Sequence, residues 1–232
     1  VMLKKYELSQ TGSSFIAAWK GNSYNFTTNF LGLFNMYNCL AAIAASLSQG
    51  IEISVIQRAL ENADAIPGRM EIIHNAHRNI TAVVDYAHDP AALENVYKTL
   101  QEIGSGDLKE RLIAVLGAVG GGRDTAKRPI LGALASRFAK YVIITNEDPY
   151  NDDPNEIMNQ VEKGVLQDNS RLPNTNYWKI LDRRAAIQKA VSLAMPGGII
   201  ALTGKGCEEV MAVSGRLIPW DDRAEARAAL KI

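Results

Sequence analysis

The feature that most constrains the fold is a regular alternation of short apolar runs and longer amphipathic segments after residue 67. Most of the apolar runs are rich in β-branched residues, and the first three are each followed by a turn signal and a segment of helical character. The apolar runs cover 82–84, 112–116, 141–145, 178–181 and 199–202, and the helical segments cover 90–101, 127–138, 154–165 and 183–194. Strands separated by helices need crossover connections, so we predict an α/β fold with a mainly parallel sheet and helices on both faces.

The first 66 residues have a different pattern. Up to residue 30 they read as short strands of alternating polar and apolar residues, separated by Gly and Asn turns. From 32 to 63, small and apolar residues recur at helical spacing, with a stop at Gly50 and a candidate cap of a second helix at Ser54. The Pro67-Gly68 break that follows predicts a domain boundary, which divides the chain into 1–66 and 67–232.

Charge and composition argue against several classes of partner. Lys plus Arg equals Asp plus Glu at 25 each, and no block of like charge occurs, so nothing indicates nucleic acid or an acidic membrane surface. The apolar runs are too short to span a bilayer. Cys39 and Cys207 lack the paired spacing of a zinc site or a redox motif, which favours a reducing, cytoplasmic setting without a metal site. We expect a cytoplasmic monomer that binds neither nucleic acid nor membrane.

Candidate functional residues follow the predicted strands, at the edge where parallel sheets bind ligands. The first strand ends in Asp85-Tyr86-Ala87-His88, which places an acid and an imidazole three residues apart before a helix that starts at Pro90. Two interpretations stay open. The pair is functional, or Asp85 caps the turn and His88 lies on the surface.

A glycine-rich turn follows the second strand. It reads Gly117-Ala118-Val119-Gly120-Gly121-Gly122-Arg123-Asp124 and leads into Lys127-Arg128-Pro129. Such a turn lets a ligand approach the backbone, and Arg123 can grip a carboxylate with two hydrogen bonds beside the N-terminus of the next helix. The alternative is a flexible turn with a solvated Arg123. The spacing differs from a dinucleotide fingerprint, which argues against an NAD site.

Carboxylates gather after the third strand, in Asn146-Glu147-Asp148-Pro149-Tyr150-Asn151-Asp152-Asp153. Asp152 and Asp153 fit a solvated turn and the N-cap of the next helix, whereas Glu147 and Asp148 lie closer to the strand end and are candidates for holding an ammonium group.

After the last strand, Lys205 lies between two glycines. No G-x-x-x-x-G-K-[ST] run occurs in this sequence, so it contains no triphosphate cradle, and its three histidines lack triad or metal-ligand spacing.

Five groups of residues, in this order, resemble the motifs of the Mur ligases, and the match covers nearly the whole chain. They are Phe34-Asn35-Met36-Tyr37-Asn38, Pro67-Gly68-Arg69-Met70-Glu71, Asp85-Tyr86-Ala87-His88, Gly121-Gly122-Arg123-Asp124 with Lys127-Arg128-Pro129, and Gly204-Lys205-Gly206 with Glu208. Within the family, the resemblance is to the ligases that add the third amino acid of the peptidoglycan stem peptide to UDP-N-acetylmuramoyl-L-alanyl-D-glutamate.

Members of that family have a domain for the UDP-sugar, a central ATPase domain with the P-loop, and a Rossmann-like C-terminal domain that receives the amino acid. The resemblance implies that 1–66 is the tail of the central ATP-binding domain and that 67–232 is the C-terminal amino-acid-binding domain. This arrangement would account for Val1 as the first residue and for the missing P-loop.

The resemblance also implies roles for individual residues. Those expected on the nucleotide are Asn35, Asn38, Arg69 and Asp85, and those expected in catalysis are Arg69 and His88. Those expected to bind the incoming amino acid are Arg123, Glu147, Asp148, Tyr150, Gly204 and Glu208. ATP and Mg²⁺ would be bound mainly by the missing N-terminal part, so we expect this chain alone to be inactive. The other implied partners are the UDP-linked muramoyl dipeptide, which ATP converts to an acyl phosphate, and a free amino acid whose amine attacks it.

Two departures from the family pattern stand out. Where diaminopimelate-adding members read Asp-Asn-Pro-Arg, this chain reads Glu147-Asp148-Pro149-Tyr150, and the arginine for the distal carboxylate is missing. We therefore predict L-lysine or another diamino acid as the acceptor, with L-lysine preferred over meso-diaminopimelate. Cys207 stands where the family often has His.

Two other interpretations remain. One is a related ligase, such as folylpolyglutamate or cyanophycin synthetase, against which the motifs at 85–88 and 204–206 argue together. The other is a stand-alone amino-acid or nucleotide-binding module that has no ATPase half.

Overall fold

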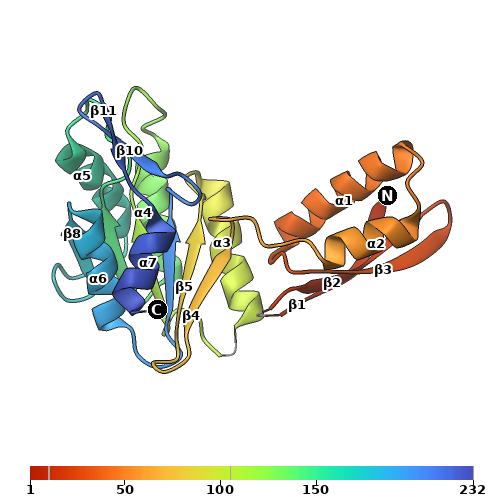
Figure 1. Ribbon diagram of the computed structural model, residues 1–232. Coiled ribbons are helices and arrows are strands. Elements are labelled where there is room, and N and C mark those ends of the chain that lie inside the picture. The colour runs from red at the N-terminus through yellow and green to blue at the C-terminus, as the bar shows by residue number, and fades with distance from the viewer. Residues whose placement is uncertain (10, 105, 232) are drawn as a thin grey trace. The chain divides into compact units, whose positions relative to one another are not determined.

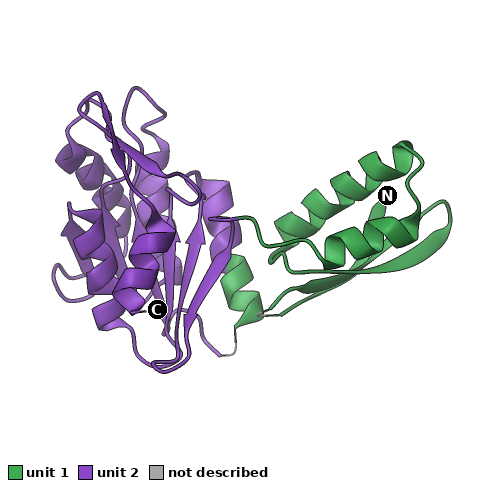
Figure 2. Ribbon diagram, viewed as in Figure 1, with its two compact units in different colours: residues 1–66, 98–105 green, residues 67–97, 106–232 purple. Residues whose placement is uncertain are grey.

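The computed structural model describes residues 1–9, 11–104 and 106–231, which divide into two compact units (Figure 2). Unit 1 comprises Val1–Ile66 and Lys98–Ser105, and unit 2 comprises Pro67–Tyr97 and Gly106–Ile232. Each unit has a sheet of its own.

Unit 1 is a small antiparallel sheet with two helices on one face (Figure 1). Its elements are β1 (Met2–Leu8), β2 (Ser13–Trp19), β3 (Asn22–Thr28), α1 (Leu33–Ser48) and α2 (Ile53–Glu61). Phe15 and Phe26 stack at 5.2 Å between ring centroids and pack with residues of both helices. The predicted strands, helices and break at Gly50 are confirmed. The cap at Ser54 is wrong, because Glu52 is the N-cap of α2.

Unit 2 contains a six-stranded sheet in the order β4-β5-β9-β6-β7-β8. The strands are β4 (Glu71–Asn75), β5 (Ile80–Asp85), β6 (Leu112–Leu116), β7 (Tyr141–Thr145), β8 (Tyr177–Ile180) and β9 (Ile199–Thr203). Only the β4–β5 pairing is antiparallel within this sheet. The predicted α/β fold with a mainly parallel sheet is confirmed, and the carboxyl ends of β5, β9, β6 and β7 lie along one edge.

Helices cover both faces of this sheet (Figure 1). They are α3 (Pro90–Ile103), which belongs to unit 2 up to Tyr97, α4 (Lys127–Phe138), α5 (Pro154–Val165), α6 (Arg183–Leu193) and α7 (Asp222–Leu230). One face packs against α6 and α7, whose Ala186, Ala190 and Leu230 join the apolar side chains of the strands. On the other face, α4 packs beside α5 and contacts α3 through Phe138 and Tyr97. A hairpin of β10 (Val210–Val213) and β11 (Arg216–Pro219) precedes α7.

Small residues and acidic caps explain how these helices are placed. A Cβ at Gly132 would collide with the Val161 carbonyl, and one at Gly164 with the Pro129 carbonyl, so two glycines let α4 and α5 approach closely. Asp153 accepts the Asn155 backbone N–H at 2.9 Å, which confirms it as the predicted cap of α5.

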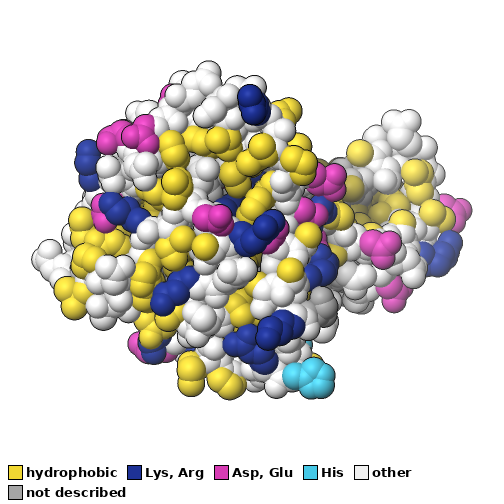
Figure 3. All heavy atoms as spheres, turned by 60° about the vertical axis from the view of Figure 1, so that its left-hand side comes forward, with side chains coloured by type: hydrophobic (Ala, Val, Ile, Leu, Met, Phe, Trp, Pro, Cys, Tyr) yellow, Lys and Arg dark blue, Asp and Glu magenta, His cyan; other side chains and the backbone are white. Residues whose placement is uncertain are grey.

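Both signs of charge occur on the face of the molecule that Figure 3 presents. Lys and Arg side chains lie there together with Asp and Glu, as the balanced composition of the chain predicts. Among the described residues, no helix combines the length and apolar character that crossing a membrane requires.

Candidate functional site

A pocket of about 330 Å³ lies at the carboxyl ends of the parallel strands of unit 2. It is lined by Tyr86, His88, Val119, Arg123, Asp124, Lys127, Glu147, Asp148, Tyr150, Gly204 and Glu208. The loops after β5, β6, β7 and β9 supply all of these residues except Lys127, which begins α4, because parallel strands end at one edge of a sheet. The pocket thus brings together all six residues that the sequence assigned to the incoming amino acid, and His88 with them.

The glycine-rich turn after β6 packs against the loop after β7. A Cβ at Gly120 would collide with the Pro149 carbonyl, and one at Gly121 would lie 2.8 Å from Cδ2 of Tyr150. The Gly120 backbone N–H donates to the Asp148 carbonyl at 2.8 Å. The sequence suggested that these glycines let a ligand approach the backbone. In the structure, the space beside Gly120 and Gly121 is filled by the protein's own loop after β7. Gly122 alone of this group has open space beside it.

Tyr150 is fixed by its backbone. Its N–H donates to the Ala212 carbonyl at 2.9 Å, and its carbonyl accepts the Ser214 N–H at 2.6 Å, so the loop is joined to β10. Its φ of 52° lies in the left-handed region, which is uncommon for a residue with a Cβ. These contacts hold the ring against Gly121, with 38% of the residue exposed.

Lys205 is almost completely buried and binds two of the carboxylates. Its ammonium nitrogen lies 2.8 Å from Oδ2 of Asp148 and 2.7 Å from Oε2 of Glu208. Asp148 also accepts the Ala212 backbone N–H at 2.7 Å. The carboxylate of Asp148, which the sequence suggested for a ligand's ammonium, therefore already holds the ammonium of Lys205. Glu208 keeps part of its surface open, and its other oxygen accepts the Tyr86 hydroxyl at 3.2 Å.

Glu147 differs from its neighbour. It is 2% exposed, and its carboxylate lies against Gly204, where any Cβ would collide with it. Its side chain makes no hydrogen bond to another described residue, although it faces the pocket. Burial raises the pKa of Glu147 to about 7, the charge of Arg183 opposes that rise, and the charge of Asp148 adds to it. A carboxylate with these properties can pair with an incoming cation.

Two cations, Arg123 and Lys127, line the pocket. Arg123 is exposed, and its side chain has no hydrogen-bond or ion-pair partner among the described residues. Lys127 donates to the His88 carbonyl at 2.8 Å. Arg128, which is buried, donates to the Val119 carbonyl at 2.8 Å and thereby holds the glycine-rich turn. Arg123 is thus the cation that is free to bind an anion in the pocket.

The two ends of the Asp85–His88 motif lie in different surroundings. The Asp85 carboxylate is buried and accepts the backbone N–H groups of Met70 and Ala87, both at 2.8 Å, which is the turn-forming role. Burial raises the pKa of Asp85 above its ordinary value. His88 lines the pocket, with Nδ1 2.9 Å from the Tyr86 carbonyl. The guanidinium of Arg69 lies 4.6 Å from the Tyr86 ring centroid and does not line the pocket.

The two asparagines assigned to the nucleotide belong to unit 1 and lie on α1. Asn35 is buried, and its side-chain amide donates to the Leu31 carbonyl at 2.8 Å. Asn38 is exposed and donates to Oδ1 of Asn35 at 3.1 Å. Asn38 therefore keeps an accessible amide on this face of the helix.

The sequence did not indicate the ion pairs that shape the site. Lys205 and Arg183 are buried cations, but their partners Asp148 and Asp222 are 57 and 39 positions away in the chain. Lys127 and Tyr86 lie inside recognised motifs, which is the signal that could have identified them. The described residues contain no cluster of three His, Cys, Asp or Glu side chains able to hold a metal ion.

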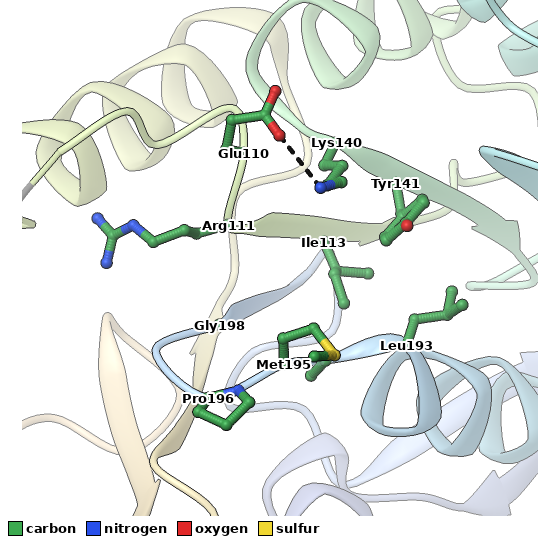
Figure 4. Close-up of a pocket in the computed structure, with 10 residues that line it drawn as sticks. Glu110, Arg111, Ile113, Lys140, Tyr141, Leu193, Met195, Pro196 and Gly198 are labelled. Atoms are coloured by element: carbon green, nitrogen blue, oxygen red, sulfur yellow. Dashed lines mark hydrogen bonds and ion pairs between the residues drawn. The ribbon is translucent and has the colours of Figure 1, made fainter.

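A second pocket, of about 70 Å³, lies at the opposite end of the sheet (Figure 4). An ion pair of 3.1 Å between Lys140 and Glu110 crosses its rim, and Ile113, Leu193 and Met195 supply an apolar wall. The Arg111 side chain points away from these apolar residues in Figure 4. This pocket is far smaller than the first, and the carboxylate that lines it, Glu110, is already paired with Lys140.

Comparisons with known proteins agree with these features. Residues 68–206 match the family model described as Mur ligase, glutamate ligase domain. The chain is 36% identical over 220 residues to a UDP-N-acetylmuramoyl-L-alanyl-D-glutamate–2,6-diaminopimelate ligase of Syntrophomonas wolfei, covering 95% of this chain and 43% of the relative. A protein of the same name from Aquifex aeolicus is 38% identical over 211 residues, covering 91% and 41%.

A solved structure of a ligase of that name superposes with a TM-score of 0.65 at 32% identity, covering 99% of this chain and 45% of the other. The chain thus spans less than half of the length of the relatives that it matches.

Proposed function

The chain belongs to the Mur ligase family, and from this premise we propose that it is the C-terminal part of an ATP-dependent ligase of peptidoglycan synthesis. The whole enzyme would add the third amino acid to UDP-N-acetylmuramoyl-L-alanyl-D-glutamate. Residues 1–66 would be the tail of the central ATP-binding domain, and 67–232 the C-terminal domain that receives the amino acid. The names of relatives that match more than nine-tenths of this chain support the proposal.

One observation supports a role of this chain in binding the amino acid. The pocket at the strand ends contains an arginine without a partner, Arg123, together with a buried carboxylate without a hydrogen bond, Glu147. A free amino acid carries a carboxylate and an ammonium group, which are the two complementary charges. We propose that Arg123 binds the α-carboxylate and that Glu147 binds an ammonium group, with Glu208 beside it.

The chemistry follows from the family. ATP would phosphorylate the glutamyl carboxylate of the UDP-linked dipeptide, and the amine of the amino acid would attack the acyl phosphate and release phosphate. The residues of this chain would contribute by holding that amine in position. ATP and Mg²⁺ would be bound mainly by the part of the enzyme outside this chain, with Arg69 reaching the phosphates from its exposed position and Asn38 from unit 1 on the adenine side.

The acceptor is a separate step of the proposal. The relatives are named for 2,6-diaminopimelate. Diaminopimelate-adding members of the family have an arginine for the distal carboxylate of the amino acid. In this chain Tyr150 stands at that position, and its ring packs against Gly121. No cation takes the place of that arginine at the loop after β7, and Glu147 would repel a second carboxylate. We propose a diamino acid as the acceptor, with L-lysine preferred.

The test uses the full-length protein with ATP, Mg²⁺ and the UDP-linked dipeptide, and offers free amino acids one at a time. Incorporation of a diamino acid into the nucleotide product supports the proposal. Addition of glutamate to a folate, or binding of amino acids without any ATP-dependent product, would favour the related ligase or the stand-alone module instead.

A further inference from the structure

Arg183 joins two of the strand ends that form the floor of the pocket. It is the first residue of α6, and its side chain is 1% exposed. Its guanidinium donates to the Asn146 carbonyl at 3.2 Å and to the Thr203 carbonyl at 2.9 Å. Asn146 follows β7 directly, and Thr203 ends β9, while β6 lies between these strands. The next residues along the chain are Glu147 and Gly204, which contact each other in the pocket.

The C-terminal helix supplies the counter-charge of Arg183. Asp222, the first residue of α7, has no exposed surface and accepts Nε and Nη2 of Arg183 at 2.7 and 2.6 Å. Asp222 also accepts the Trp220 indole N–H at 2.8 Å. A two-point pair of this kind fixes the plane of the guanidinium. The helix α7 thereby helps to place a cation behind the pocket, although it lies outside the residues that match the family model.

Glu147 has four charged groups around it, and Arg183 is the strongest attraction among them. The others are Asp148 beside it, Lys205 after β9 and Lys127 on α4. Lys205 is already paired with two carboxylates, and Lys127 donates to a backbone carbonyl. Without Arg183, the pKa of Glu147 would rise further above its ordinary value, which favours the neutral carboxyl.

We propose that Arg183 is a positioning residue of the pocket, which holds Glu147 against Gly204 as a carboxylate, and that Asp222 limits how much of the arginine's charge reaches Glu147. The functional role of this arrangement rests on the proposed function, because the ammonium group of an acceptor amino acid would pair with an ionised Glu147. The arrangement of Arg183, Asp222 and Glu147 lies within unit 2. It predicts opposite effects for the two partners, because loss of Arg183 favours neutral Glu147, whereas loss of the Asp222 charge favours the carboxylate.

The test is a titration of the Glu147 carboxyl carbon by NMR in the 232-residue chain labelled with carbon-13 glutamate. Glu147→Gln identifies the resonance by its disappearance. We expect Arg183→Gln to raise the titration midpoint by about one pH unit or more, and Asp222→Asn to lower it. Arg183→Lys keeps the cation and should titrate closer to the wild type than Arg183→Gln does.

Arg184→Gln is the matched control. Arg184 is the next residue of α6 and also pairs with α7, through Glu225 at 2.7 Å, but its side chain is 61% exposed. Its removal breaks an α6–α7 ion pair without changing the charge behind the pocket, so the Glu147 midpoint should not move.

An unchanged midpoint in folded Arg183→Gln, or shifts of the same sign in Arg183→Gln and Asp222→Asn, would overturn the proposal. If Arg183→Gln does not fold, Asp222→Asn decides alone, and a midpoint that does not fall overturns the proposal. The measurement involves neither ATP nor an amino acid. Its outcome is therefore independent of whether the ligase assay succeeds.

Discussion

Lys205 and Asp148 form a buried ion pair, with Nζ 2.8 Å from Oδ2 and only 1% of the lysine side chain exposed. The pair joins the loop after β9 to the loop after β7, and Glu208 extends it to the pocket wall. Removal of one member of a buried pair leaves the other charge uncompensated, which is more costly than the net contribution of the pair itself.

The first prediction concerns this pair. Lys205→Met should destabilise unit 2 by about 3–5 kcal/mol, and Lys205→Met combined with Asp148→Asn should recover part of the loss. Urea unfolding in a Trp19→Phe background measures unit 2 alone, because the other two tryptophans, Trp178 and Trp220, belong to it. Lys140→Met is the control, since Lys140 pairs with Glu110 at the surface and should cost at most about 1 kcal/mol. Equal costs for the two lysines would contradict the prediction.

The second prediction separates crowding from backbone strain at the glycines of the pocket. Gly204 and Gly122 both have positive φ, of 105° and 74°, but only Gly204 has a neighbour that a Cβ would meet, the Glu147 carboxylate. Gly122→Ala should cost about 1–2 kcal/mol from the left-handed backbone alone. Gly204→Ala should cost more in urea unfolding and should also displace the Glu147 carboxyl resonance. A Gly204→Ala protein with an unshifted Glu147 resonance would show that the contact does not position this carboxylate.

The third prediction is a pH dependence of stability. In the folded chain the pKa of Glu147 is about 7, above its ordinary value of 4.5, so between these values the folded state binds more protons than the unfolded state does. The stabilising contribution of the neutral carboxyl is therefore complete below pH 4.5 and is lost as the pH rises through 7.

Glu147→Gln removes this dependence. Its stability relative to the wild type should rise between pH 4.5 and about pH 8, by about 3.5 kcal/mol, because each pH unit between the folded and unfolded pKa values corresponds to about 1.4 kcal/mol. Unfolding of both proteins at several pH values gives the difference directly. A difference that is flat across this range would mean that Glu147 is ionised at its ordinary pKa.

The fold was largely predictable because its strands and helices carry local signals. The buried strands β6 and β7 are apolar runs between turns, and α4 and α5 were predicted with the boundaries that they have in the structure. The edge strand β4 was not predicted, because Glu71 and His74 break its apolar pattern. The hairpin and α7 were also not predicted. For the hairpin the reason is similar, because β11 is exposed along its whole length and has no alternation of buried and exposed residues.

The site was predictable as a set of residues but not as a set of contacts. The motifs indicated which side chains meet at the strand ends, because parallel strands end at one edge. They did not indicate that Asp148 is neutralised by Lys205, or that Gly120 and Gly121 receive Pro149 and Tyr150 instead of a ligand. Those contacts join segments far apart in the sequence. The local sequence around Lys205, which lies between two glycines, does not indicate whether the lysine is buried or exposed.

The fourth prediction concerns Arg123. Its side chain is exposed and has no partner among the described residues, so Arg123→Ala should change the stability of the chain by less than about 0.5 kcal/mol. In the full-length enzyme the same change should raise the KM for the amino acid about tenfold to a hundredfold, which corresponds to a charge-assisted hydrogen bond, and leave the KM for ATP nearly unchanged. Arg216→Ala, on the exposed strand β11, is the control. Equal effects on both KM values would assign Arg123 to the structure of the loop.

The last prediction is the choice of acceptor: L-lysine should be incorporated faster than meso-diaminopimelate at equal concentration by the full-length enzyme. Both amino acids offer an ammonium group to Glu147, but diaminopimelate adds a distal carboxylate, which Tyr150 cannot neutralise. An unpaired buried charge costs several kcal/mol, so a preference of at least about tenfold is expected. Tyr150→Arg should shift the ratio towards diaminopimelate, whereas Tyr150→Phe should leave it unchanged. The relatives' names point to the opposite order, and a competition assay that favours diaminopimelate would show that a cation such as Arg123 binds the distal end.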